Sequence, residues 1–404
     1  MTSFRNCLIG MAGMASFGAM AQPGTISGDI VRVGVLTDMA SLYSDFSGKG
    51  SAEAVKMAVE DFGGTVLGKP IEVVVADHQN KPDLAASKAR EWFDADNVDV
   101  IVNLVSSGAA LAVSEVGREK HRPVIVTAAY SGRLTNEACS PYTVHYQSDT
   151  MALANTPRVL VSQGADSWYF ITADYAFGHT MERDASAAIE AGGGKVIGSV
   201  RHPLNTLDFS SFLLQAQASR AKFVGLANAG GDTVATIKAA KDFGLTRKGA
   251  QSVVAMALFT TDIHAVGLET AQGLYTTASF YWDRDEASRS WSERFYKRVG
   301  KMPTEIHAAD YSATTQYLKA VAAAGSDDAD AVLGKMRSTT VDDLYATNGH
   351  IRADGRLIKD LYLVQVKTPA ESKRPWDYLN VRATIPGEQA FLPAAKSSCA
   401  LLKN

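Results

Sequence analysis

Short apolar segments alternate with segments of helical spacing along most of this chain, and this rhythm limits the fold more than any other feature. In the first half the apolar runs cover residues 30–38, 71–77, 98–105 and 122–129, and helical spacing covers 48–62, 82–94 and the segment that begins at 106. Strands that alternate with helices of about 12 residues form parallel sheets with helices on both faces. Gly63 and Gly64 are placed to end the first helix and Pro82 to open the second.

The same rhythm restarts after about residue 147. Expected strands cover 167–174, 194–200, 222–228, 251–258 and 272–282, and expected helices cover 177–191, 208–219 and 231–243. Further helices are expected at 287–300 and 305–325, followed by short strand-like segments at 349–355 and 361–367. The chain has 404 residues, more than the roughly 250–300 at which single cores stop growing. We therefore predict an α/β fold with two doubly wound parallel-sheet lobes.

Residues 1–21 have the features of a secretory signal peptide. Arg5 precedes a short apolar stretch, and the small-residue triplet Ala19-Met20-Ala21 precedes Gln22. Glycines and serines interrupt the stretch, which falls short of the ~20 apolar residues of a membrane span. A transmembrane anchor is therefore the less favoured alternative. We expect cleavage after Ala21 and a location in the periplasm.

Two cysteines, Cys139 and Cys399, follow the expected cleavage site. An even pair in an exported protein is a disulfide candidate. The bridge would tie the C-terminal tail to the middle of the chain, and two unpaired thiols are the alternative.

Composition and motifs argue against nucleic-acid binding and against catalysis. The formal net charge is −3, so the sequence implies no broad basic surface for nucleic acid. The chain contains no G-x-G-x-x-G after the first strand, no G-x-x-x-x-G-K-[ST], no H-E-x-x-H and no G-x-S-x-G. Its 8 histidines lack the spacing of metal ligands. We therefore expect a binding protein without cofactor or metal rather than an enzyme.

The apolar run 98–105 leads directly into Ser106, Ser107 and Gly108, which also begin a helix. Ligands of parallel sheets bind beyond the carboxyl ends of the strands. The free N–H groups and the partial positive charge of a helix start attract anions. These small residues let a ligand approach, and a serine hydroxyl adds a donor. The segment therefore suits a carboxylate, with a plain serine N-cap as the alternative.

Aromatic residues recur at the other expected strand ends. They are Tyr43, Tyr130, Tyr175, Phe177 and Phe259, and the polar Asn228 lies at another of these ends. Five aromatic side chains at the strand ends of two facing lobes favour a cleft that encloses a flat, partly apolar ligand. Ordinary packing is the alternative for each of them singly.

The signal peptide and four segments, taken in order, carry a family resemblance. The segments are VGVLTDMASLYSDFSGKGSAEAVKMAVEDF, VNLVSSGAALAVSEV, PVIVTAAYSGRLT and ITADYAFGHTMERD. Together they resemble the periplasmic substrate-binding proteins of ATP-driven (ABC) importers, of the type that binds leucine, isoleucine and valine. The resemblance covers essentially all of the chain after the signal peptide. It implies two α/β lobes joined by three crossings, which close on the ligand by a hinge.

The resemblance also implies positions for ligand contacts. Ser106 or Ser107 corresponds to the serine that binds the ligand carboxylate. After the fourth strand, Ala128 is placed for backbone contacts, and Tyr130 stands where amino-acid binders often have Thr or Ser. In the second lobe, the family's aromatic position falls at Phe177.

One departure from the family changes the expected ligand. Amino-acid binders place an acid late in the second lobe to hold the ligand ammonium, and this stretch here reads Ala257, Leu258 and Phe259. Asp262 follows a little further on and could take this place, but we expect it to cap the next helix instead. A buried ammonium without a charged partner is costly, so the sequence most resembles the branch that takes up aromatic carboxylates. Binding of branched-chain or other amino acids in the same transport role is the alternative, and a ligand-sensing receptor domain is a remote one.

The expected lobes each combine two parts of the chain. The first lobe comprises residues 29–146 and about 282–345, and the second comprises 147–281 and about 361–404. Crossings between them are expected near 145–149, 278–283 and 345–361. We expect a monomer that delivers a small-molecule carboxylate to the membrane permease and ATPase subunits of an importer, with no nucleic-acid partner.

Overall fold

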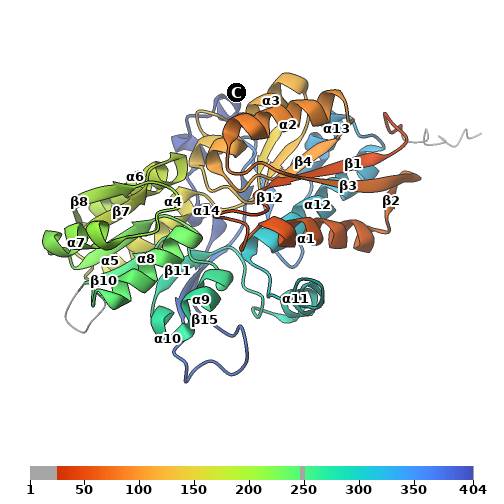
Figure 1. The fold of residues 1–404 in the computed structure, drawn as a ribbon. Helices are drawn as coiled ribbons and strands as arrows, with labels where there is room; N and C mark the ends of the chain where they lie inside the picture. Colours follow the sequence, from red (N-terminus) through yellow and green to blue (C-terminus); the bar gives the residue numbers. More distant parts are fainter. Residues whose placement is uncertain (1–24, 246–250, 404) are drawn as a thin grey trace, which may run out of the picture.

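The computed structural model describes residues 25–245 and 251–403, so the expected signal peptide lies outside the described residues. Two parallel sheets, each covered by helices, form two lobes that lie side by side (Figure 1). This is the α/β architecture that the alternation of apolar and helical segments predicts.

The first sheet has the strand order β2-β3-β1-β4-β5-β6. Its strands are β1 (Val31–Thr37), β2 (Thr65–Val66), β3 (Lys69–Asp77), β4 (Val100–Asn103), β5 (Val124–Val126) and β6 (Thr143–His145). The short β2 pairs antiparallel with β3, and the other neighbours pair in parallel. The carboxyl ends of the parallel strands therefore share one edge of the sheet, which faces the second lobe.

Helices cover both faces of the first sheet because alternate strand residues point to opposite sides. Val33 and Val35 of β1 pack in one core with Met57, whereas Leu36 packs in another core with Trp92. The helices of the first face are α1 (Gly48–Phe62), α11 (Glu286–Val299) and α12 (Glu305–Ala324), with α13 (Ala329–Ser338) against α12. Those of the second face are α2 (Pro82–Asp94) and α3 (Ser107–Lys120).

The second sheet has the strand order β10-β9-β7-β8, and all of its neighbours pair in parallel. Its strands are β7 (Ser167–Ala173), β8 (Lys195–His202), β9 (Phe223–Ala227) and β10 (Ser252–Ala255). Phe170 packs with Met181 of α6 on one face, and Ile171 packs with Leu213 of α7 on the other. The covering helices are α4 (Thr150–Leu153), α5 (Asn155–Ser162), α6 (Ala176–Ala191), α7 (Ser210–Ser219) and α8 (Gly231–Asp242).

Small antiparallel sheets complete the fold. The sequence predicted strands at 272–282, 349–355 and 361–367, but not their antiparallel pairing or the additional strands β13 and β15. One sheet has the order β11-β14-β15 and the other pairs β12 with β13. The strands are β11 (Tyr275–Ala278), β12 (His350–Ile351), β13 (Leu357–Ile358), β14 (Leu361–Val366) and β15 (Leu379–Ile385). Tyr275 pairs with Gln365, so this sheet joins segments that are far apart in the sequence.

The remaining short elements lie in connections and in the C-terminal tail. They are η1 (Gly132–Thr135), α9 (Thr260–Val266), α10 (Leu268–Ala271), α14 (Gly387–Ala390), η2 (Ala394–Lys396) and η3 (Ala400–Leu402). Cys139, between η1 and β6, forms a disulfide with Cys399 in the tail, and their Cα atoms are 5.8 Å apart. The disulfide therefore joins the end of the chain to the first lobe.

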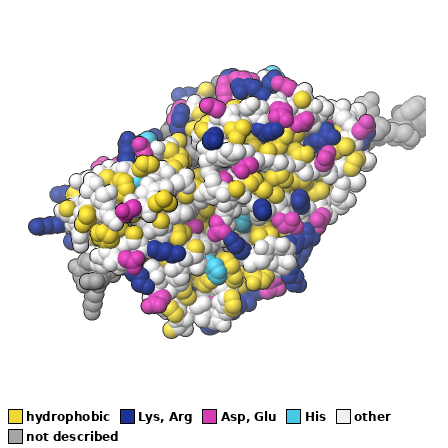
Figure 2. Space-filling model, in the orientation of Figure 1, with side chains coloured by type: hydrophobic (Ala, Val, Ile, Leu, Met, Phe, Trp, Pro, Cys, Tyr) yellow, Lys and Arg dark blue, Asp and Glu magenta, His cyan; other side chains and the backbone are white. Residues whose placement is uncertain are grey.

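Charges of both signs are interspersed over the face drawn in Figure 2. Many charged side chains of the described residues form ion pairs; in one of them the Lys222 ammonium nitrogen lies 2.5 Å from a carboxylate oxygen of Asp166. The face shows no extended area of one sign, which agrees with the small net charge.

Candidate functional site

A narrow pocket lies between the two lobes, at the carboxyl ends of their strands, and the closed lobes leave a cavity of only about 10 Å³ in it, close to the space of one water molecule. Its lining residues are Tyr43, Phe46, Val105, Ser107, Ala128, Tyr130, Tyr175, Phe177, Ala229 and Phe259. Six of these ten side chains are aromatic and none is charged. The pocket therefore offers flat apolar walls and a few hydroxyl groups.

The loop between β1 and α1 carries the first two aromatic side chains, Tyr43 and Phe46. Asp38, fully buried at the end of β1, holds this loop: its carboxylate accepts hydrogen bonds from the backbone N–H groups of Ser41 and Tyr43, both at 2.9 Å. The Asn80 amide donates to it as well, at 2.7 Å. Burial alone would raise the pKa of Asp38, but these hydrogen bonds outweigh it and the pKa is lowered. Asp38 is thus charged and fixes Tyr43 over the pocket.

The end of β4 turns sharply toward the pocket. Asn103 and Leu104 both adopt left-handed backbone conformations, with φ of 85° and 62°, so the strand ends at Asn103, two residues before the predicted end. Such conformations are strained for residues other than glycine. The buried Asn103 amide donates to the carboxylate of Asp310 on α12, at 3.1 and 3.2 Å, and this contact holds the turn. The turn places Val105 in the pocket wall.

The three predicted residues at the start of α3 have different surroundings. Ser107 lines the pocket, and its contact with a ligand carboxylate stays a prediction. Ser106 is the N-cap, and its side chain makes no capping hydrogen bond and does not line the pocket. Gly108 faces α2: a Cβ atom there would lie 2.9 Å from Cγ of Pro82, so the glycine allows α3 to pack on α2.

Ala128 and Tyr130, which both follow β5, also line the pocket. The Tyr130 hydroxyl donates a hydrogen bond to the carboxylate of Glu305, the first residue of α12. The same carboxylate accepts the N–H of Ser279 at 2.7 Å. Burial raises the pKa of Glu305, although both hydrogen bonds oppose the shift.

Sequence reasoning missed Glu305. An acid in the first turn of a helix normally stabilises the helix dipole from an exposed position. Here the Glu305 side chain is buried instead, beneath a pocket residue, and only the tertiary contact with Tyr130 reveals it.

The second lobe contributes Tyr175 and Phe177 at the start of α6, Ala229 after β9 and Phe259 before α9. The Tyr43 and Tyr175 hydroxyls are 2.5 Å apart and join the lobes across the pocket. Burial raises the pKa of both tyrosines, so both hydroxyls are neutral.

Stacked rings make the second contact between the lobes. Phe46 and Phe259 stack with 4.2 Å between ring centroids, and Tyr130 meets Phe177 edge-on at 6.2 Å. The lobes are therefore closed on each other in this structure.

Two predicted residues of the second lobe do not line the pocket. The buried Asn228 side chain accepts a hydrogen bond from the Thr233 hydroxyl at 2.8 Å and contacts His202, so it holds the start of α8. Leu258 points into a hydrophobic core together with Ile263 of α9. The pocket is instead completed by Phe46, Val105 and Ala229, small or apolar residues with no distinctive sequence signal.

Asp262 caps α9, as the sequence predicted. Its carboxylate accepts the N–H of Phe259 at 3.0 Å. Burial raises the pKa of Asp262 to about 7, and the hydrogen bond from Phe259 partly opposes this shift. The Asp262 side chain takes part in the cap and does not line the pocket.

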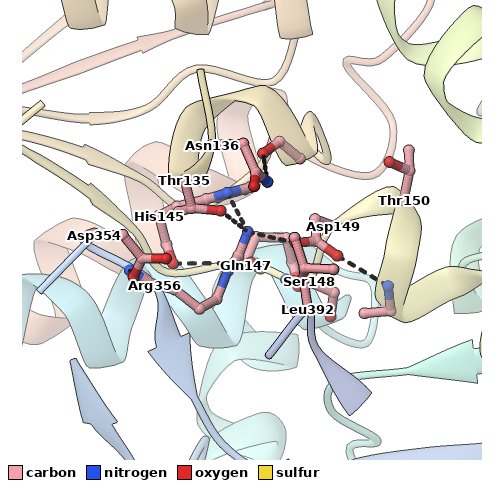
Figure 3. A network of polar contacts seen from close by, with 12 residues as sticks. Thr135, Asn136, His145, Gln147, Ser148, Asp149, Thr150, Asp354, Arg356 and Leu392 are labelled. Carbon is pink, nitrogen blue, oxygen red and sulfur yellow. Dashed lines mark hydrogen bonds and ion pairs between the residues drawn. The ribbon is translucent and has the colours of Figure 1, made fainter. Parts of the chain in front are cut away.

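Buried polar contacts connect residues near the crossings that the sequence predicts between the lobes (Figure 3). Arg356, just before β13, lies 2.9 Å from the carboxylate of Asp149, and its guanidinium also donates to the backbone oxygen of Gln147. A second N–H of Arg356 reaches Nδ1 of His145. Burial lowers the pKa of His145, with a further contribution from Arg356, so the ring is neutral: Nε2–H donates to the oxygen of Ala129 and Nδ1 accepts from Arg356.

Ser279, near another of the expected crossings, joins the same network. Its hydroxyl lies 2.9 Å from the side-chain oxygen of Gln147, which the Tyr345 hydroxyl also approaches, at 3.2 Å. The Lys359 ammonium donates to the backbone oxygen of Ser279 and lies 4.1 Å from the centre of the Tyr345 ring. Burial, and then the charge of Arg284, lowers the pKa of Lys359 to about 7. Glu305 binds the N–H of the same serine, so pocket and crossings share one hydrogen-bonded network.

No helix within residues 25–245 and 251–403 is long and apolar enough to cross a membrane. In the same part of the chain, no group of three or more His, Cys, Asp or Glu side chains is arranged to hold a metal ion.

Comparison with known proteins decides the family. The periplasmic binding protein family matches residues 30–373, most of the chain. The chain belongs to this family. The resemblance of its sequence to the periplasmic substrate-binding proteins of ABC importers is confirmed, and so is the prediction of a binding protein rather than an enzyme.

Solved structures of periplasmic binding proteins share the fold. A protein from Burkholderia mallei is 55% identical, with a TM-score of 0.90 over 92% of this chain and 99% of that one. A branched chain amino acid ABC transporter periplasmic ligand-binding protein from Burkholderia xenovorans LB400 is 42% identical, with a TM-score of 0.83 over 92% and 100%. A solute binding protein of an ABC transporter from Rhodopseudomonas palustris BisB5, in complex with 3,4-dihydroxy benzoic acid, is 22% identical, with a TM-score of 0.81 over 89% and 98%. The last likeness shows the fold alone.

Proposed function

We propose that this periplasmic binding protein captures a small aromatic carboxylate between its lobes and delivers it to the membrane permease of an ABC importer. The observation that carries the proposal is the lining of the pocket: six aromatic side chains, no charged one, and Ser107 at the start of α3. In this proposal the lobes open to admit the ligand, whose ring then separates Phe46 from Phe259 and packs against the aromatic walls, while its carboxylate meets Ser107.

The start of α3 suits the carboxylate for two physical reasons. The first N–H groups of a helix have no partner within the helix, and they carry a partial positive charge. Ser107 is buried and faces the pocket, so its hydroxyl can donate alongside them. A negative group bound there is stabilised without an arginine or lysine.

The same lining disfavours the ammonium group of an amino acid. None of the pocket residues carries a carboxylate. Asp262 caps α9, and Glu305 accepts hydrogen bonds from Tyr130 and Ser279. An ammonium in this pocket would remain buried without a charged partner, which is costly.

Two related proteins bear on the choice of ligand. The Rhodopseudomonas palustris protein of the same fold holds an aromatic acid, which agrees with the proposal. The Burkholderia xenovorans protein is named as the ligand-binding protein of a branched chain amino acid ABC transporter. Because that protein is 42% identical, a branched-chain amino acid is the second candidate ligand.

A calorimetric titration with two groups of ligands tests the proposal. Benzoate, 4-hydroxybenzoate and a phenylpropenoate form one group, and leucine, isoleucine and valine form the other. We expect binding in the first group and at least about tenfold weaker binding in a Ser107→Asp variant, because two negative charges would meet in a buried site. Ser211→Asp, at an exposed position on α7, makes the same change of charge and should leave the affinity unchanged. Binding of the amino acids alone would favour the second candidate.

Other features of the transport role are part of the same proposal. They are export by a signal peptide at residues 1–21, cleavage after Ala21, a monomer in the periplasm, and transfer of ligand to permease and ATPase subunits. We also propose the lobe boundaries given by residues 29–146 with about 282–345, and 147–281 with about 361–404. The network of Gln147, Ser279 and Arg356 lies near the three expected crossings and supports these boundaries.

A further inference from the structure

Two consecutive glycines of the second lobe support the Tyr43 loop of the first lobe. Gly230 is the N-cap of α8 and Gly231 is its first residue. The backbone N–H of Gly231 points to the backbone oxygen of Leu42, at 3.4 Å. This contact lies beside the pocket, because Leu42 directly precedes Tyr43.

Position 230 requires a glycine for two reasons: its own backbone conformation and its close approach to the first lobe. Its φ is 60° and its ψ is −132°, a conformation that other residues rarely adopt. A Cβ atom at this position would also lie 2.8 Å from the oxygen of Leu42 and 2.8 Å from Cε1 of Phe46. A substitution of Gly230 would therefore combine strain within the second lobe with a clash against the first.

Gly231 has no such requirement of its own. It lies in helical backbone that any residue can adopt, and a Cβ atom there would meet no atom of the second lobe outside its own helix within 4 Å. A Cβ atom at Gly231 would lie 3.0 Å from Cδ1 of Leu42, which belongs to the other lobe. A side chain at position 231 would therefore meet the first lobe before it met any part of the second.

We infer that Gly231 determines how far the lobes close, and through this the affinity for the ligand. This inference rests on the proposed function, in which the ligand is enclosed between the lobes. A side chain at position 231 would push Leu42 away, and with it Tyr43 and Phe46. The contacts of Tyr43 with Tyr175 and of Phe46 with Phe259 would lengthen. A smaller closed fraction weakens the observed affinity in proportion.

The test compares side chains of increasing size at position 231 with the same changes at a matched position. Gly231→Ala should weaken binding by a few fold, because the flexible end of Leu42 can move slightly, and Gly231→Leu by about tenfold or more. Gly334→Ala and Gly334→Leu are the controls. Gly334 is an exposed residue of α13, and a Cβ atom there would meet no atom of the described residues within 4 Å. These variants should bind like the wild-type protein.

Removing the opposing side chain supplies a second control. In the double variant Leu42→Ala with Gly231→Ala, the added methyl group has room, so affinity should return to that of Leu42→Ala alone. The probes are 4-hydroxybenzoate and L-leucine, each titrated first into the wild-type protein. If only leucine binds, the aromatic ligand of the proposed function is wrong, and the series at position 231 is measured with leucine.

A distance measurement needs no ligand. Spin labels attached after Lys56→Cys on α1 and Lys195→Cys on β8, both at exposed positions, report the separation of the lobes. We expect Gly231→Leu to shift the distance distribution away from the closed form, with or without ligand, and Gly334→Leu to leave it unchanged. An unchanged distribution and an unchanged affinity in Gly231→Leu would overturn the inference whichever ligand the protein binds.

Discussion

Arg356 and Asp149 form an ion pair, with 2.9 Å between nitrogen and oxygen, and both side chains are almost completely buried near two of the expected crossings. Asp149 also caps α4 by accepting the N–H of Ala152 at 2.9 Å. The pair therefore links a segment near the C-terminal end of the chain to the start of the second lobe.

Removal of Arg356 should destabilise the protein strongly. Arg356→Met leaves the Asp149 carboxylate buried without its partner, for which we expect a loss of about 3–5 kcal/mol in the free energy of unfolding. Urea denaturation measures this change. Lys222→Ala, which breaks the exposed pair with Asp166, should cost no more than about 1 kcal/mol. Equal losses in the two variants would contradict the structural role of Arg356.

Asp310 should make stability depend on pH. Burial raises its pKa from 3.8 to about 7, although hydrogen bonds from Ser51, Thr127 and Asn103 oppose the shift. Between pH 4 and pH 7 the folded protein holds a proton that the unfolded chain has lost, so this group's contribution to stability falls as the pH rises through that window. The neutral variant Asp310→Asn should reduce the fall between pH 5 and pH 7 by about 1–2 kcal/mol.

The control for Asp310 is an exposed carboxylate. The pKa of Asp208 is lowered by its hydrogen bonds with Ser210, and Asp208→Asn should leave the slope of stability against pH between 5 and 7 unchanged. Urea denaturation at several pH values gives both slopes. The same slope in Asp310→Asn as in the wild-type protein would mean that Asp310 is charged throughout this range.

Tyr130→Phe should weaken both the fold and the binding of ligand. The change removes the hydroxyl that donates to Glu305 and leaves that buried carboxylate with one hydrogen bond fewer. We expect a loss of about 1–3 kcal/mol in stability, measured by denaturation. Glu305→Gln replaces the buried carboxylate, so the additional loss of the Tyr130 hydroxyl then leaves no charged group without its donor. The stability losses of the two single variants should therefore not add in the double variant. Strict additivity would show that the two side chains act independently.

Loss of the disulfide should lower stability without changing the pocket. The bond joins Cys139 to Cys399 over 260 residues of sequence, and removal of such a link typically costs about 2–5 kcal/mol. The double variant Cys139→Ser with Cys399→Ser should therefore melt at a lower temperature than the wild-type protein. Addition of a reductant should lower the wild-type melting temperature in the same way, and it should have no effect on the variant.

Local patterns in the sequence predicted the helices and strands of both lobes well. The spacing of apolar residues, with Pro82 and Gly63 at the boundaries, gave the bounds of α1 and α2 as the structure has them. The family resemblance and the strand-end positions also pointed to the pocket, since Tyr43, Ser107 and Phe259 all line it. These features depend on residues close together in the chain, so they can be predicted from the sequence without knowledge of the fold.

Other features depended on contacts between distant segments, and only the tertiary structure decided them. The antiparallel sheet of β11, β14 and β15 pairs strands from remote parts of the chain, and β15 exposes much of its length, so no local apolar pattern marks it. The choice of Ser107 over Ser106 follows from the direction of each side chain at the turn after Asn103. Glu305 and Gly231 owe their roles to contacts with distant residues. Tyr130 contacts Glu305 and Leu42 approaches Gly231, and neither neighbour is close to its partner in the sequence.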